Sequence, residues 1–249
     1  MSLQALLDHG LALDRPPRLT ATDIASWLRL SQCDRFLRFQ LEYRNERRSD
    51  ASGFLEELDV APQPLPSLLT GSGVGFEETI LSQIAQLMPL RRFDEDRRSG
   101  NDNSRLVRSI EALVAGERIA ITQPRLHIEL AGWELRGDLD LLLVHRDEDD
   151  RLHLTVLDMK SSADSRVEHS IQVAMYSTML RELCRRSGVE IESLSGGIIY
   201  RGTDDPDALT DSARRKLERS QEAAESLGLV DAFLDLTGND RTTHKPLRI

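Results

Sequence analysis

Two short apolar segments joined by an acidic turn form the clearest pattern in this 249-residue sequence. Leu141–Val144 and Leu152–Leu157 predict the bodies of two strands, and the run Asp147–Asp150 predicts the turn between them. Both segments are apolar at odd and even positions, which is typical of strands covered on both faces. An antiparallel hairpin with its turn centred on this run sets Asp140 roughly opposite Asp158.

Apolar residues at helical spacing predict helices before and after the hairpin. Near the N-terminus, Thr22 is predicted as the N-cap of a helix, with a second helix directly after it from about Cys33. The remaining predicted helices cover residues 3–13, 73–88, 104–115, 167–186 and 206–236.

Further strand patterns flank the hairpin. The segments 119–123 and 126–130 predict, together with the hairpin, a meander of three or four antiparallel strands. Leu194–Tyr200 follows a helix, so it is predicted to pair parallel to the strand that carries Asp158, through a right-handed crossover. We therefore expect an α/β fold, with a mixed sheet of four or five strands flanked by helices.

A polar, proline-containing segment divides the chain. Residues 47–72 predict a loop or linker, and 91–103 predict a charged loop. We expect an N-terminal helical lobe with its linker over 1–72, and the main domain with its C-terminal helix over 73–249.

The formal net charge of −10 argues against non-specific binding of polyanions over the whole surface, but not against nucleic-acid binding in a cleft. Two cysteines, Cys33 and Cys184, form no disulfide framework and favour a reducing cytoplasm. Cys33 is expected to be a small buried residue. We expect neither a signal peptide nor a membrane-spanning segment.

Three charged residues at the ends of the predicted strands suggest chemistry. Asp140, Asp158 and Lys160 are costly at the ends of buried strands unless they are paired or bound to a metal. Two converging acids with a lysine beside them are what a divalent cation and a phosphate require. From the hairpin alone, a salt-bridged strand end explains the pattern equally well.

A polar stripe lies on the helix that follows Lys160. His169, Gln172 and Tyr176 are spaced to share one helix face and are candidates to line the same cleft. The alternative is that Gln172 and Tyr176 only satisfy buried backbone groups.

Four short motifs follow one another along the chain: G-x-x-F-E at Gly73–Glu77, G-x-x-D at Gly137–Asp140, D-x-K at Asp158–Lys160 and Q-x-x-x-Y at Gln172–Tyr176. In this order they resemble the PD-(D/E)XK nuclease superfamily. The match is closest to its RecB-like branch, which includes the CRISPR-associated nuclease of adaptation modules. The segment 20–39 also resembles the N-terminal helix pair of that branch, and the resemblance spans about Thr20 to Tyr200.

The resemblance implies a restriction-endonuclease-like core and a role for each motif residue. Asp140 and Asp158 are expected to bind Mg²⁺ or Mn²⁺ with the backbone carbonyl of Met159. Glu77 is expected to complete or support the metal shell, unless it only complements the dipole at the start of its helix. Lys160 is expected to orient and activate the attacking water and to stabilise charge on the phosphate.

The resemblance also implies the substrate and the partners. Gln172, Tyr176 and His169 are expected to brace the site and contact DNA. The expected function is metal-dependent DNA hydrolysis, of exonuclease type, in repair, recombination or defence, with a helicase or another repair or CRISPR protein as a possible partner. The alternatives are a catalytically inactive nucleic-acid-binding or scaffold subunit on the same fold, or a coincidence of motifs.

The sequence departs from the branch at several positions. Leu139 replaces the proline of the superfamily name, and Phe76 stands where many relatives have histidine. Cys33 matches the first cysteine of the iron–sulfur relatives, but no cysteine follows Cys184. Either the cluster has been lost or the sequence is a fragment, and we expect no cluster. The G-x-x-D spacing favours Asp140 over Asp138 as the metal ligand.

Overall fold

The structure is a computed structural model. It describes residues 18–33, 36–37, 67–93, 100–160, 167–201 and 247–248. The helices predicted over 3–13 and 206–236, most of the second N-terminal helix and residues 47–66 of the linker lie outside these residues. No helix in the described part of the chain is long and apolar enough to span a membrane.

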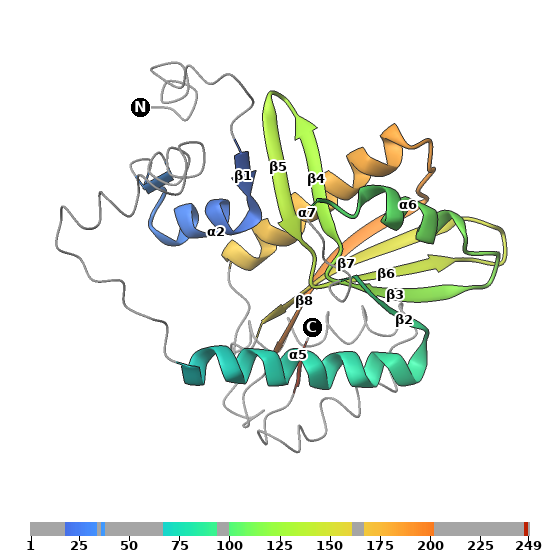
Figure 1. Ribbon diagram of the computed structural model, residues 1–249, viewed down its shortest axis with the longest axis horizontal. Helices are drawn as coiled ribbons and strands as arrows, with labels where there is room; N and C mark the ends of the chain where they lie inside the picture. Colours follow the sequence, from blue (N-terminus) through green and yellow to red (C-terminus); the bar gives the residue numbers. More distant parts are fainter. Residues whose placement is uncertain are drawn as a thin grey trace, which may run out of the picture.

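A mixed six-stranded sheet forms the centre of the molecule (Figure 1), in the order β2-β3-β6-β7-β8-β9. Strand β6 runs antiparallel to both of its neighbours, β3 and β7, and β9 runs antiparallel to β8. Strand β2 runs parallel to β3, and β8 runs parallel to β7. This arrangement confirms the α/β fold with a mixed sheet. The strands are β2 (Leu90–Arg92), β3 (Arg118–Thr122), β6 (Leu141–Arg146), β7 (Leu152–Lys160), β8 (Ser193–Arg201) and β9 (Leu247–Arg248).

The register of the central hairpin is the predicted one. Leu141 pairs with Leu157, and Val144 pairs with Leu154. One step beyond the first pair, Asp140 therefore lies opposite Asp158. The predicted parallel pairing of the strand after the long helix is also confirmed, since Asp158 pairs with Ile198 of β8.

Helices cover both faces of this sheet (Figure 1). Helix α7 (Val167–Arg186) and helix α6 (Asn103–Glu111) lie on one face, and helix α5 (Ser67–Leu87) lies on the other. Even-numbered residues of β6 and β7 pack in one core cluster with α6 and α7, and odd-numbered residues pack in a second cluster with α5. The strands are therefore apolar on both faces because both faces are covered.

The predicted single meander is wrong. Strand β4 (Arg125–Leu130) pairs with β5 (Trp133–Asp138), and β1 (Arg18–Thr20) pairs with β5 in parallel, so that β1-β5-β4 forms a separate three-stranded sheet. Ala131 and Gly132 join β4 and β5 with φ angles of 51° and 79°. Two central residues with positive φ form the turn type that closes tight hairpins, which explains the pairing.

Three local predictions are also wrong. Helix α2 (Ala21–Arg29) begins after the N-cap Thr20, which forms a capping box with Asp23, and Thr22 lies in its first turn. Helix α5 begins at Ser67, inside the predicted linker, and β2 extends into the start of the predicted charged loop. The division at residue 72 stays a prediction, although β1 pairs with β5 and α2 contacts α7.

Candidate active site

A cavity of about 560 Å³ opens where the ends of β5 and β7 meet the starts of α2 and β6. It brings together Asp140, Asp158, Lys160, Gln172 and Tyr176, which are five of the residues singled out from the sequence. The remaining lining residues are Thr20, Ala21, Thr22, Arg125, Arg136, Gly137 and Asp138.

Asp140 is held at the start of β6 by the backbone of the neighbouring strand. The N–H of Met159 donates a hydrogen bond of 2.7 Å to Asp140 Oδ2. The Asp140 side chain is 25% exposed, so its carboxylate remains open to the cavity. The hairpin register produces this contact, because it places Asp140 beside the end of β7.

Asp158 is the most buried charged group of the site, with a side chain that is 3% exposed. Its Oδ1 accepts a hydrogen bond of 2.8 Å from Lys160 Nζ, which also lies 3.8 Å from Asp140 Oδ2. Its Oδ2 is buried and has no hydrogen-bond partner. Burial raises the pKa of Asp158, the nearby charge of Asp140 raises it further, and Lys160 opposes this shift.

Gln172 and Tyr176 form the wall contributed by α7, and both side chains are buried. Gln172 Oε1 is buried without a hydrogen-bond partner, so it satisfies no backbone group. The Tyr176 ring lies directly on Gly137 and occupies the place that a Cβ atom would take. The glycine of the G-x-x-D motif is therefore the residue that lets Tyr176 approach the acids.

Glu77 lies on the other face of the sheet and interacts with Asp140 and Lys160 through their charges. It is half-buried on α5 and does not line the cavity. Burial raises its pKa, the charge of Asp140 raises it further, and Lys160 lowers it. Because α5 begins at Ser67, Glu77 lies well inside the helix, and the explanation through the dipole at the helix start is wrong.

Two other candidate residues lie away from the cavity. His169 is half-buried on α7, one turn before the lining residues of that helix, and does not line the cavity. Cys33 is exposed, so the expectation of a small buried residue is wrong; Cys184 is the buried cysteine.

The comparisons with known proteins agree with this geometry. A profile of the PD-(D/E)XK nuclease superfamily matches residues 27–237, which is more than half of the chain and includes Asp140, Asp158 and Lys160. The chain belongs to the PD-(D/E)XK nuclease superfamily. No curated protein matches the sequence. Membership implies a metal-dependent nuclease.

The donor groups of this superfamily member fit a hard divalent cation. Mg²⁺ takes one or two carboxylates and keeps several of its waters. Asp140 and Asp158 supply two carboxylates, and the buried unpartnered Oδ2 of Asp158 is an acceptor without a donor. Within the described residues, no three His, Cys, Asp or Glu side chains form a closed metal site, so backbone and water oxygens are needed as further ligands.

The two aspartates of the G-x-x-D motif have different partners in this nuclease-superfamily fold. Asp138 binds Arg125 through two hydrogen bonds, of 2.7 Å from Nε and 3.0 Å from Nη2. Asp140 faces Lys160 instead. Asp138 is therefore engaged by an arginine, whereas Asp140 lies beside the lysine of the cavity.

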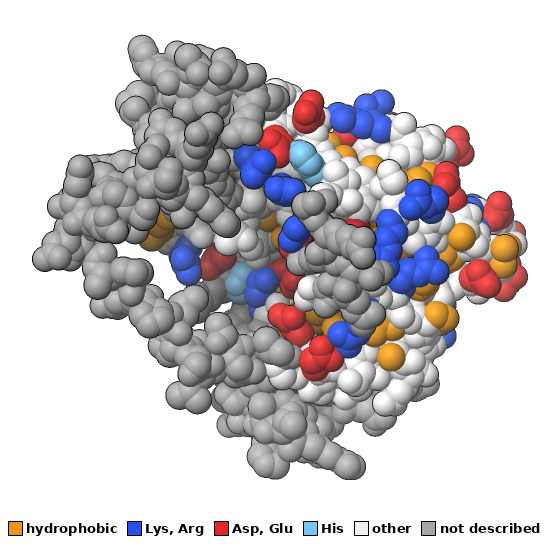
Figure 2. Space-filling model, viewed as in Figure 1, with side chains coloured by type: hydrophobic (Ala, Val, Ile, Leu, Met, Phe, Trp, Pro, Cys, Tyr) orange, Lys and Arg blue, Asp and Glu red, His pale blue; other side chains and the backbone are white. Residues whose placement is uncertain are grey.

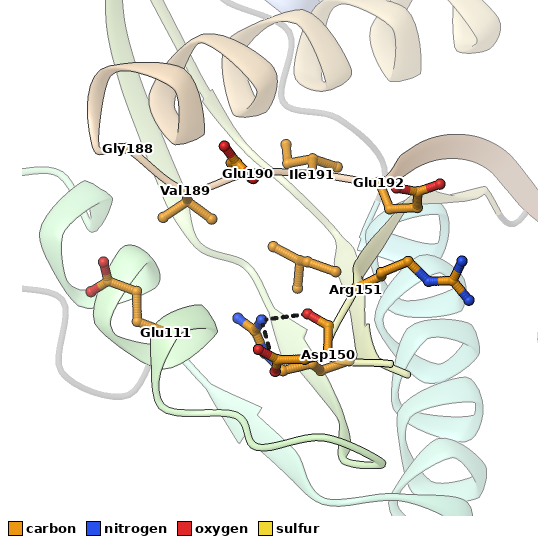
Figure 3. A pocket seen from close by; sticks show the side chains of 10 residues that line it. Glu111, Asp150, Arg151, Gly188, Val189, Glu190, Ile191 and Glu192 are labelled. Atoms are coloured by element: carbon orange, nitrogen blue, oxygen red, sulfur yellow. Dashed lines mark hydrogen bonds and ion pairs between the residues drawn. The ribbon is translucent and has the colours of Figure 1, made fainter. Parts of the chain in front are cut away.

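A larger cavity, of about 740 Å³, lies at the opposite end of the hairpin, beside the β6–β7 turn. Its acidic residues include Glu111, Asp150, Glu190 and Glu192 (Figure 3), and Arg146 is bonded to Asp150 there. The larger cavity is lined by four carboxylates and two arginines, Arg146 and Arg151, whereas the smaller cavity is lined by three carboxylates and three basic side chains. The smaller cavity therefore repels a phosphate backbone less.

Sequence analysis missed the arginines of the smaller cavity. Arg125 and Arg136 come from β4 and β5, the sheet that was not predicted. The only signal in the sequence was the position of Arg136 directly before Gly137.

Proposed function

We propose that this protein hydrolyses phosphodiester bonds in DNA with a divalent cation, Mg²⁺ or Mn²⁺, bound by Asp140, Asp158 and the backbone carbonyl of Met159. One observation supports this most strongly. Asp140, Asp158 and Lys160 converge in one cavity, and a buried oxygen of Asp158 lacks a donor.

In this proposal, Asp140 and Asp158 each supply one carboxylate ligand to the cation. When bound, a divalent cation lowers the pKa of a coordinated water and neutralises charge on the phosphate. Lys160 Nζ now lies against both carboxylates, at 2.8 Å from Asp158 and 3.8 Å from Asp140. Once a cation takes over this charge balance, the ammonium group is free to orient water and to donate to the phosphate.

Glu77 supports the metal site from the face of the sheet that α5 covers. Burial and, after it, the nearby Asp140 charge raise the pKa of Glu77, so a bound cation would favour its ionised form. We assign it to hold a water ligand of the metal. Gln172 and Tyr176 fix the opposite wall, and His169 extends the α7 contact to the DNA backbone.

The finer activity rests on the resemblance to the RecB-like branch. It favours exonuclease action in DNA repair, recombination or defence, alongside a helicase or another repair or CRISPR protein. The presence of only two cysteines favours the cytoplasm as the location and departs from the iron–sulfur relatives, so we propose that no cluster is bound.

The test is a cleavage assay on end-labelled single- and double-stranded DNA with Mg²⁺, Mn²⁺ or EDTA. The unsubstituted protein is expected to cut with either metal and not in EDTA. Lys160→Ala is expected to lose about 10²-fold or more in rate, as is typical when a transition-state donor is removed. Arg118→Ala, an exposed residue of β3 outside the cavity, is the matched control and is expected to cut normally.

Two results would refute the proposal. One is cleavage that persists in EDTA, and the other is full activity in Lys160→Ala. DNA binding without any metal-dependent cutting by the unsubstituted protein would instead establish the inactive binding subunit.

A further inference from the structure

Arg136 lies in the wall of the cavity that the second sheet provides. It is a half-buried residue of β5 and directly precedes Gly137, on which Tyr176 packs. Its side chain lines the same cavity as Asp140 and Asp158. In the β1–β5 register Arg136 is paired with Thr20, the N-cap of α2. One wall of the cavity therefore carries an arginine and the start of a helix side by side.

The cations of the cavity differ in their partners. Arg125 is bound to Asp138 by two hydrogen bonds, and Lys160 is bound to Asp158. Arg136 Nε is buried and has no hydrogen-bond partner, and no ion pair joins Arg136 to another of the described residues. A buried guanidinium N–H without an acceptor is costly, so this position favours a ligand that brings acceptor oxygens.

The start of α2 makes the same wall more attractive to an anion. Its capping box uses the Thr20 hydroxyl and the Asp23 N–H and carboxylate. The first-turn N–H groups of Ala21 and Thr22 take no part in this box, and both residues line the cavity. Free N–H groups favour an acceptor at such a position, while the Asp23 carboxylate offsets part of the helix dipole.

We propose that Arg136 binds a phosphate of the DNA strand next to the scissile one, with the N-terminus of α2 adding to the positive potential. This assignment rests on the proposed function, because Asp140, Asp158 and Lys160 are taken to hold the scissile phosphate. A planar guanidinium fits two phosphate oxygens at once. The second sheet would then set the direction in which the strand leaves the metal site.

The first test measures DNA affinity in a Lys160→Ala background with Mg²⁺, within a time over which the DNA stays intact. Adding Arg136→Ala is expected to weaken binding about tenfold for all sequences. It is also expected to lower the salt slope, which is the slope of the logarithm of the binding constant against the logarithm of the salt concentration, by about one unit. Arg136→Lys is expected to keep the salt slope, because it keeps the charge. The exposed Arg118→Ala is the matched control, and thermal melting checks that each variant is folded.

The second test locates the contact on the DNA. A set of oligonucleotides carries one neutral methylphosphonate each, at successive positions around the cleavage site. With the Lys160→Ala protein, one position beside the scissile phosphate is expected to weaken binding strongly. With Arg136→Ala added, that same position is expected to cause no further loss, because the two changes remove one contact.

The outcomes separate this assignment from the function on which it rests. An unchanged affinity and salt slope in folded Arg136→Ala would overturn the role of Arg136 while leaving metal-dependent cleavage in place. The same is true if every methylphosphonate weakens both proteins equally. A protein without any metal-dependent cleavage would overturn the proposed function itself.

Discussion

At the scale of single residues, Gly137 is explained by the ring that lies on it. Tyr176 occupies the space of a Cβ atom at this position, and both residues line the cavity. The glycine in the G-x-x-D motif thus reflects close packing beside the acids and no special backbone conformation. A side chain there must push the ring away from the wall of the site.

Gly137→Ala is therefore expected to destabilise the protein by about 1–3 kcal/mol, as overpacking does, and to lower activity by displacing Tyr176. Urea unfolding measures the first effect. Gly75→Ala is the matched control, because Gly75 lies inside α5 with no atom within 4 Å of the added Cβ. This variant is expected to gain up to about 1 kcal/mol from helix propensity. Equal stability of the two variants would contradict the packing explanation.

Asp158 links the site to the pH dependence of stability. Burial raises its pKa from the ordinary 3.8, so the folded protein binds a proton there more tightly than the unfolded chain does. The free energy of unfolding is then expected to fall as pH rises from the ordinary value through the raised one. In Asp158→Asn this contribution is absent.

Urea unfolding at about pH 5 and about pH 8, without metal, checks this prediction. The unsubstituted protein is expected to lose more stability between the two values than Asp158→Asn does. If the two proteins lose the same amount, Asp158 is not the buried carboxyl that the structure indicates.

At the scale of elements, the central hairpin was predictable and the second sheet was not. The hairpin has apolar residues on both faces and an acidic turn, and the position of the turn fixes the register that sets Asp140 opposite Asp158. Strand β5, by contrast, is half-buried along its whole length and shows no alternation. It is a strand because β1 and β4 pair with it, and β1 is far away in the sequence.

Helix α5 shows the limit of local propensity. Its first half includes three glycines, which disfavour helix, so the sequence predicts a later start. Its second half packs Phe76, Ile80 and Ile84 against the sheet. Packing there stabilises the costly nucleus of the helix, and extension from a formed nucleus costs less, which local propensity alone does not reveal.

The cap of α2 gives a prediction at this scale. Thr20→Ala removes the side chain that accepts from the Asp23 N–H, so a loss of about 1 kcal/mol in stability is expected. Thr22→Ala, the residue predicted from sequence, is exposed and is expected to change stability by less than about 0.5 kcal/mol. Thermal melting of both variants distinguishes them. A larger loss in Thr22→Ala would show that the helix begins later than it does in this structure.

At the scale of the whole molecule, the overall negative charge contrasts with the basic side chains that line the cavity. Figure 2 shows basic and acidic side chains interspersed over the described residues of one face. The net charge is −10, so unspecific attraction to DNA is weak and the cavity must supply the local positive charge. Sequence predicted the acids and Lys160 but not Arg136, because the wall that carries Arg136 is made by the unpredicted sheet.

The central claim is that Asp140 and Asp158 together bind a divalent cation. Calorimetric titration with Mn²⁺ tests it most directly. The unsubstituted protein and Asp138→Asn are expected to bind, because Asp138 is engaged by Arg125. Asp140→Asn and Asp158→Asn are expected to lose binding. Undiminished Mn²⁺ binding by a folded protein that carries both of these substitutions would contradict the account.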